Sequence, residues 1–338
     1  MTGIHLVGSI PLADAETVFR TVASALGPHL ATLPDGETGV RKDWIAWQYA
    51  VLARTPGLEP IPVGDRGYLR RQLVRLDGTR DAPALGALGY ADAAIASYAT
   101  FARLQQDGVI PAAVRFQVSL PTPLAPLTVF VAPGDRARVE PAYQAALLGE
   151  LAQICAAIPH DRLAIQWDVA VEVALVDAVF PAHFAEVERG VRDRLAALLA
   201  AVPRDVALGV HLCYGDFGHR HFADPPDAGT LLRLAMMLFA LDRPLAWLHL
   251  PVPRAWTAPA AYAPLAALTV PAATALYLGV VHMTDGLEGA RARLDLARAA
   301  LAPAIGARIG AATECGWGRR PPETIDALIA LHAAIVRA

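Results

Sequence analysis

Short runs of aliphatic and β-branched residues alternate along this chain with longer segments in which apolar residues recur every three or four positions. The short runs predict strands that are buried on both faces, and the longer segments predict amphipathic helices. The predicted strands lie near Ile4–Val7, His29–Leu33, Val114–Val118, Leu163–Asp168, Val206–Leu212, Leu245–Leu250, Leu276–Val281 and Ala307–Thr313. The predicted helices between them include Pro141–Ala157, Phe184–Ala201, Leu287–Ala302 and Thr324–Val336.

Eight strands, each followed by a helix, predict an α/β protein with a single (β/α)8 TIM barrel that spans residues 1–338 as one domain. A doubly wound open sheet is the alternative, and the strand count favours closure. Two long insertions, Pro34–Ala112 after the second strand and Ser119–Pro141 after the third, leave from the carboxyl ends of their strands. Barrel enzymes form their sites on that face, so we expect the insertions to wall or cover a pocket there.

The composition excludes several classes of protein. Apolar residues make up 55% of the chain, which rules out disorder, and a net charge of −3 gives no reason to expect binding to nucleic acid or to a membrane surface. Three separated cysteines form no disulfide framework, and the first residues show no signal-peptide pattern, so we expect a cytoplasmic protein. Charged residues and a proline interrupt the most apolar stretch, Leu231–Leu250, so we expect no membrane span.

Most residues that could ligate a metal, transfer a proton or hold a substrate stand at the carboxyl ends of the predicted strands. In chain order these residues are Gly8, Ser9, Asp35, Glu37, Asp168, His211, Cys213, His249, His282, Asp285, Cys315 and Arg319. The carboxyl ends of the strands in a barrel share one rim. The sequence therefore predicts that these side chains gather around a single site.

The pair of residues that most strongly indicates a metal site is His211 and Cys213. Residues two apart on a strand point to the same face, so both side chains can face the barrel mouth. Cys315 ends the last predicted strand and could join them. Imidazole and thiolate groups are suitable ligands for Zn²⁺, so we predict a zinc site at His211, Cys213 and Cys315. His249 is a further metal-ligand candidate, and a buried structural histidine is the alternative.

The remaining residues divide into substrate-binding and catalytic groups. The predicted substrate-binding residues are Gly8, Ser9, Asp35, Glu37, Asp168 and Arg319. The carboxylates among them could hold an ammonium or hydroxyl group, or could cap the following helices. The guanidinium group could bind a carboxylate or phosphate, or could lie in solvent. His282 and Asp285 are the predicted catalytic acid/base pair, with a supporting structural role as the alternative.

Several of these motifs resemble the catalytic C-terminal barrel of cobalamin-independent methionine synthase, within the wider uroporphyrinogen decarboxylase/methionine synthase-like superfamily. His211-Leu-Cys-Tyr is similar to the family's His-Met-Cys-Tyr, and Glu314-Cys-Gly-Trp-Gly-Arg-Arg320 is similar to Asp-Cys-Gly-Leu-Lys-Thr-Arg. Both of these family motifs supply zinc ligands. This chain also departs from the family: His249 stands where the family has a glutamate ligand, and His282-Met-Thr-Asp285 stands where it has Asp-Ile-His.

The resemblance implies a zinc cofactor and a methyltransferase-like transferase that moves a methyl or other alkyl group onto a thiol. The partners would then be a small-molecule thiol, with homocysteine as the first to test, and a small-molecule methyl donor. Two other classes stay open: a metal-independent decarboxylase or lyase of the same superfamily, and a non-catalytic protein that binds a metal or a metabolite. A homo-oligomer is compatible with the sequence.

Overall fold

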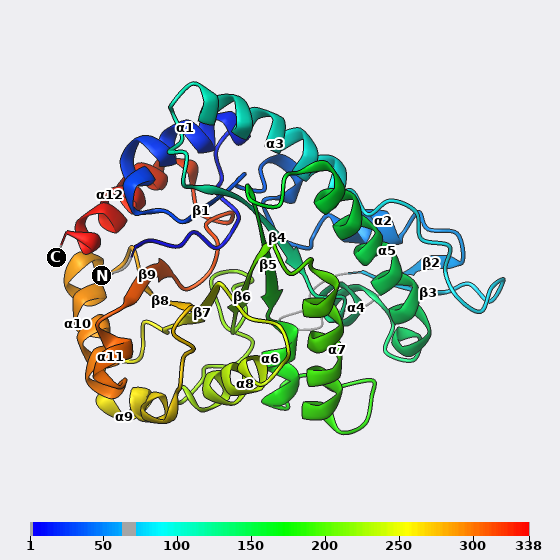
Figure 1. The fold of residues 1–338 in the computed structure, drawn as a ribbon. Coiled ribbons are helices and arrows are strands. Elements are labelled where there is room, and N and C mark those ends of the chain that lie inside the picture. The colour runs from blue at the N-terminus through cyan, green and yellow to red at the C-terminus, as the bar shows by residue number, and fades with distance from the viewer. Residues whose placement is uncertain (1–2, 63–71, 338) are drawn as a thin grey trace.

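A curled parallel sheet lies at the centre of the molecule, with helices around its outer face (Figure 1). The computed structural model describes residues 3–62 and 72–337. The strands, in their order across the sheet, are β1 Thr32–Pro34, β4 Arg115–Pro121, β5 Leu163–Val169, β6 Ala207–Leu212, β7 Trp247–Pro251, β8 Ala275–Val281 and β9 Ile309–Thr313. They follow chain order from edge to edge, without the reversal that defines the doubly wound alternative. The arrangement is TIM-like, and all the carboxyl ends of the strands meet at one edge.

The prediction of a closed eight-stranded barrel is wrong. The segment expected to form the first strand, Ile4–Val7, is not a strand. It lies between the two edges of the seven-stranded sheet, where Ile4 forms isolated parallel bridges to Leu30 and to Ala311. The segment therefore occupies the place of an eighth strand but makes only one bridge to each side.

Side chains explain why this segment does not continue as a strand. The carbonyl oxygen of Val7 accepts hydrogen bonds from Gln166 Nε2 at 2.7 Å, Ser119 Oγ at 2.9 Å and Gln117 Nε2 at 3.0 Å. Gln117 Nε2 also donates to the carbonyl oxygen of Leu6 at 3.0 Å. Because side chains of β4 and β5 bind these carbonyl groups, the groups do not take part in a ladder with a neighbouring strand.

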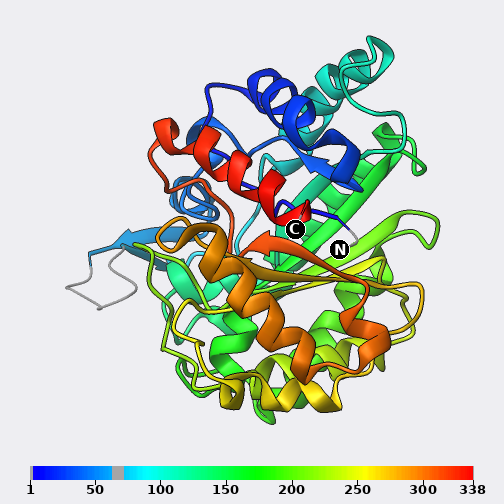
Figure 2. The same ribbon diagram turned by 90° about the vertical axis from the view of Figure 1, so that its left-hand side faces the viewer.

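The longer helices cover the outside of the sheet (Figures 1 and 2). They are α1 Ala15–Leu26, α3 Tyr90–Gln106, α5 Arg136–Ala157, α7 Val187–Ala201, α8 Gly229–Phe239, α10 Gly286–Ala300 and α12 Ile325–Val336. α1 illustrates why they form: Asp14 caps its first turn by accepting from the Thr17 N–H, and Val18, Val22 and Leu26 recur every four residues and are buried. With helices outside and side chains filling the interior, every residue of β5 is buried.

Shorter elements lie in the connections between these strands and helices. They are α2 Gln48–Leu52, α4 Leu124–Phe130, α6 Val171–Val176, α9 Pro259–Tyr262, α11 Pro303–Gly306 and the 3-10 helices η1 Gly27–His29, η2 Gly39–Arg41, η4 Ala263–Ala267 and η5 Pro322–Thr324. The first insertion also contains an antiparallel hairpin of β2 Leu58–Ile61 and β3 Leu73–Leu76, which projects from the ring of helices (Figure 1). Among the described helices, none combines the length and the hydrophobicity that a membrane crossing needs.

Candidate functional site

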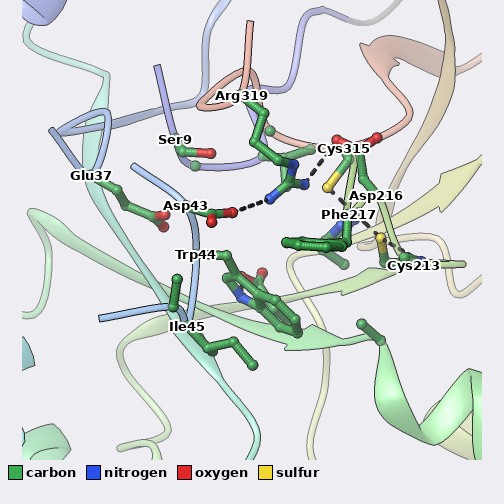
Figure 3. A pocket seen from close by; sticks show the side chains of 18 of the residues that line it. Ser9, Glu37, Asp43, Trp44, Ile45, Cys213, Asp216, Phe217, Cys315 and Arg319 are labelled. Atoms are coloured by element: carbon green, nitrogen blue, oxygen red, sulfur yellow. Dashed lines mark hydrogen bonds and ion pairs between the residues drawn. The ribbon is translucent and has the colours of Figure 1, made fainter. Parts of the chain in front are cut away.

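Three potential metal ligands from distant parts of the chain meet at the carboxyl edge of the sheet. His211 lies in β6, Cys213 follows that strand, and Cys315 follows β9. Their ligand atoms all lie within 4.8 Å of one another. The two Sγ atoms are 3.8 Å apart (Figure 3), well beyond the bond length of about 2.05 Å in a disulfide. The sulfurs are therefore free thiols that face each other.

The spacing and chemistry of these donors fit a tetrahedral zinc ion. Zn–S bonds are about 2.3 Å long, so tetrahedral angles place two sulfur ligands about 3.8 Å apart, and the observed separation is 3.8 Å. Burial, together with the charge of His5, lowers the pKa of His211 to about 3. His211 is therefore neutral at physiological pH and keeps a lone pair for a metal. The adjacent Cys315 sulfur and burial raise the pKa of Cys213 well above its usual value, an effect that a bound cation would reverse.

His249 lies beside His211 on the neighbouring strand and is not part of this group of three. The two residues are paired in the register of β6 and β7, and their Nδ1 atoms are 2.6 Å apart. His249 is fully buried, whereas His211 lines the pocket described next. The structure thus places His249, the further metal-ligand candidate, in contact with the candidate ligand His211.

A pocket opens beside the three ligands, and most of the predicted substrate-binding residues line it (Figure 3). The predicted residues on its wall are Gly8, Ser9, Glu37, Asp168, His211, Cys213, Cys315 and Arg319. Asp35 is an exception, because its carboxylate accepts hydrogen bonds from Arg41 Nη2 at 2.7 Å, Ser97 Oγ at 2.8 Å and the Glu37 backbone N–H at 2.8 Å. Asp35 therefore shapes the turn that carries Glu37.

Two carboxyl groups with raised pKa values share this pocket. Burial raises the pKa of Asp168 to about 7, although its oxygens accept hydrogen bonds from Gln166 Nε2 at 2.9 Å and Trp44 Nε1 at 3.2 Å. Burial and the charge of Asp168 raise the pKa of Glu37 well above its usual value. Glu37 and Trp44 both have a φ of 47°, a left-handed conformation that is strained for such residues. Glu37 and Asp168 form no ion pair with another residue among those the structure describes, although the charges of Arg41 and Arg319 partly offset the rise in the pKa of Glu37. These two carboxyl groups are therefore suited to bind a cationic group.

Two glycines after Cys315 allow the amino-terminal segment to pack against the cysteine. A Cβ atom at Gly316 would lie 2.4 Å from Ser9 Oγ, and one at Gly318 would lie 1.8 Å from the carbonyl oxygen of Lys42. The Ser9 carbonyl accepts from the Trp317 N–H at 2.6 Å, and Ser9 Oγ accepts from the Gly318 N–H at 3.2 Å. The Gly-Trp-Gly sequence thus fixes the end of the first segment beside Cys315.

Arg319 connects two loops at the pocket wall. Its Nη1 is 3.0 Å from Asp43 Oδ1 and its Nη2 is 2.9 Å from Asp216 Oδ2 (Figure 3). Burial opposes its charge, but Cys315 and Asp216 raise the pKa of Arg319 above its usual value. Because two carboxylates already hold the guanidinium group, Arg319 acts first as a link between the insertion after β1 and the loop after β6.

Sequence reasoning favoured core packing for Trp44, with an aromatic pocket wall as the alternative, and it missed the other apolar wall residues and the two acidic partners of Arg319. The larger apolar side chains of this wall include Trp44, Ile45, Val129, Phe130, Phe217 and Phe222. Four of these residues come from the two long insertions, which the sequence did predict as pocket walls. Asp216 could have been found within the His-Leu-Cys-Tyr-Gly-Asp motif, but Asp43 carries no such local signal.

His282 and Asp285 do not line this pocket. Both carboxylate oxygens of Asp285 bind Arg293, at 2.7 and 2.8 Å, so this carboxylate is neutralised at the start of α10. His282 Nε2 lies 2.9 Å from the carbonyl oxygen of Val252, and its Nδ1 lies 3.8 Å from Glu314 Oε2. The two residues thus engage different partners instead of forming the expected acid/base pair.

A second, larger cleft also reaches Cys315, and His282 lines it. The basic side chains on its wall are His219, Arg220, His221, Arg254, His282 and Arg320. Glu314, next to Cys315 in the chain, has its Oε1 2.7 Å from His221 Nε2. Cys315 and Gly316 line both cavities, whereas Cys213 lines only the first of these two, so Cys315 can be reached from either cavity.

Comparison with known proteins supports the fold. No protein-family model matches this chain, and no curated protein matches it. A solved structure that it does resemble is that of a Listeria monocytogenes protein described as a candidate vitamin-B12 independent methionine synthase. The sequences are 13% identical, the alignment covers 99% of each chain, and the TM-score is 0.56. The two chains share a fold.

Proposed function

We propose that this protein is a zinc-dependent transferase that moves a methyl or other alkyl group onto a thiol. The observation that carries the proposal is the convergence of His211, Cys213 and Cys315, with sulfurs 3.8 Å apart, on the wall of a pocket. The Listeria monocytogenes protein of the same fold is named for a reaction of this class, which supports the choice. The expected localisation is cytoplasmic.

Bound zinc would supply Lewis acidity that lowers the pKa of an incoming thiol, so that the thiol reacts as a thiolate near neutral pH. His211, Cys213 and Cys315 would hold the ion. Three protein ligands are typical of catalytic zinc sites, which keep a position for substrate, whereas structural sites use four. Three donors therefore favour a catalytic zinc site over a structural one.

The pocket beside the cysteines would hold the thiol substrate. Glu37 and Asp168 would bind an ammonium group of this substrate, and the backbone of Gly8 and Ser9 would help to orient it. The aromatic rings of Trp44 and Phe217 would exclude water from the reacting sulfur (Figure 3). Homocysteine carries both a thiol and an ammonium group, and it is the first acceptor to test.

The methyl donor would enter through the second cleft, because the thiol fills the first and Cys315 lines both. His221 and His282 line this cleft and are the groups available to give a proton to the leaving group. Glu314 would orient His221 through their 2.7 Å contact. This assignment keeps the predicted catalytic histidine and replaces Asp285, which Arg293 holds.

The proposal is tested by metal analysis combined with thiol alkylation assays. Purified protein should contain about one zinc per chain, and Cys213→Ser or Cys315→Ser should remove it. Cys155→Ser is the matched control, because this third cysteine lies in α5, away from the cluster. Protein purified without chelators that contains no transition metal would refute the proposal. Activity on an acidic substrate after chelation would instead favour a decarboxylase or lyase, and bound metal without turnover of any thiol would favour a binding protein.

A further inference from the structure

We propose that His249 is a positioning residue: it holds the imidazole of His211 so that Nε2, and not Nδ1, is the atom available to a metal. This inference rests on the metal centre of the proposed function but not on the transfer reaction. It differs from the expectation that His249 itself ligates the metal. The argument depends on where the two rings lie and on how many protons they can share.

The strand register brings the two rings together. His211 in β6 and His249 in β7 are partners in the parallel ladder, and their ring centroids are 4.7 Å apart with an angle of 32° between the planes. The Nδ1 atoms are 2.6 Å apart, which is the distance of a short hydrogen bond. Nδ1 of His211 is therefore occupied, and only Nε2 is left to meet a metal.

A hydrogen bond between two neutral imidazole nitrogens contains a single proton, which fixes the tautomers of both rings. If His249 donated this proton, His211 would carry its own proton on Nε2 and could not ligate a metal there. If His211 donates from Nδ1, its Nε2 keeps a lone pair. A metal on Nε2 therefore requires His249 Nδ1 to accept. Metal-ligating histidines commonly donate their second ring N–H to an acceptor of this kind, usually a carboxylate or a carbonyl group.

The surroundings of His249 fit a residue that contacts the ligand His211 and not the metal itself. His249 is fully buried and lines none of the three cavities described at the cysteines. The ring of His5 packs on it with 5.6 Å between centroids. His5 is in turn anchored to β5, because its Nε2 lies 2.8 Å from Gln166 Oε1. Packed between His5 and His211, His249 has a restricted ring orientation, which it passes on to His211 through the hydrogen bond.

Two nearly isosteric substitutions separate the hydrogen bond from simple packing. His249→Asn keeps a polar atom near the position of Nδ1, whereas His249→Leu has similar size and shape but no acceptor. We expect His249→Leu to weaken zinc binding by about 10- to 100-fold, and His249→Asn to bind zinc nearly as tightly as the unmodified protein. Zinc dissociation constants are measured by competition with a chromophoric chelator. Absorption spectra of the Co²⁺-substituted proteins report the number and type of ligands.

A second buried histidine provides the control. His332 in α12 is fully buried and its Nδ1 lies 2.8 Å from the carbonyl oxygen of Leu328. His332→Leu should lower stability, measured by urea unfolding of metal-free protein, without changing the zinc dissociation constant. This comparison separates a loss of fold from a loss of ligand positioning.

Several results would overturn the inference. His249→Leu with unchanged zinc affinity and an unchanged Co²⁺ spectrum would show that the hydrogen bond does not position His211. Equal losses in the Asn and Leu variants would assign the effect to packing, or to direct ligation if the Co²⁺ spectrum also shows one ligand fewer. Unmodified protein that binds no zinc would refute both this inference and the proposed function. Tight zinc binding without thiol alkylation would refute the proposed function alone.

Discussion

Replacing Gly318 by alanine would put a methyl group where the backbone of the first insertion now lies. A Cβ atom at this position would be 1.8 Å from the carbonyl oxygen of Lys42 and 2.9 Å from the Cβ of Ser9. Nonbonded heavy atoms normally stay about 3.5 Å apart, so one segment has to move by roughly 1.5 Å. Backbone carbonyl groups do not rotate away as a flexible side chain does. The loop that carries Cys315 is the segment that we expect to move.

The magnitude follows from the contacts that this movement disrupts. Overpacking costs about 1–3 kcal/mol. The hydrogen bonds to Ser9 from the N–H groups of Trp317 and Gly318, at 2.6 and 3.2 Å, contribute about 1 kcal/mol each. We expect the free energy of unfolding to fall by about 2–4 kcal/mol. Cys315 lies three residues before Gly318, so its displacement from Cys213 should also weaken zinc binding.

Urea unfolding, followed by tryptophan fluorescence, measures the first effect, and chelator competition under native conditions measures the second. Gly149→Ala is the matched control, because Gly149 lies within α5 and a Cβ atom there would meet nothing within 4 Å. That change should raise stability by up to about 1 kcal/mol through helix propensity. The reasoning would be refuted if Gly318→Ala unfolded at the same urea concentration as the unmodified protein and bound zinc with the same affinity.

Three further predictions concern charge and metal. Burial raises the pKa of Asp168 to about 7, above the roughly 3.9 of an unfolded chain. The free energy of unfolding should therefore fall as pH rises from about 4 to about 7, and Asp168→Asn should flatten this slope in urea titrations; an unchanged slope would contradict it. Arg319→Leu removes the cation that joins Asp43 and Asp216 and should cost about 2 kcal/mol in thermal unfolding, whereas Arg189→Leu, at a side chain 68% exposed, should cost little. Chelation should speed the modification of Cys213 and Cys315 by a thiol reagent, measured by mass spectrometry, and equal rates would argue against a bound metal.

The sheet shows which strands the hydrophobic pattern predicts correctly and which it does not. The runs around Leu163–Val169 and Ala275–Val281 were recognisable as strands, because a strand covered on both faces needs a continuous apolar sequence. The run Ile4–Val7 has the same character but forms only isolated bridges at Ile4. The carbonyl groups of Leu6 and Val7 accept hydrogen bonds from amide and hydroxyl side chains of β4 and β5, which lie more than a hundred residues away. No local pattern could have predicted that competition.

The candidate site also combines features that the sequence predicts with features that only the fold determines. His211 and Cys213 point to one face because alternate residues of a strand do so, a property of local geometry. Cys315 was placed beside them from its position at a strand end, and parallel pairing across the sheet brings these ends to one edge. The sequence also marked His282 and Asp285, but Arg293, from the next helix, holds Asp285. Which partner a charged side chain takes depends on distances that only the folded chain sets.

What the amino-acid sequence determined by itself is the alternation of strands and helices and the clustering of sulfur, imidazole and carboxyl groups at the strand ends, because periodicity and chain direction are local properties. The tertiary structure alone decided that Ile4–Val7 does not complete a ladder, that Trp44 and Asp43 form the pocket wall, and that His249 contacts His211 through its Nδ1. These outcomes depend on the register between strands and on competition for hydrogen bonds between distant segments, and neither is encoded in the spacing of residues along one segment.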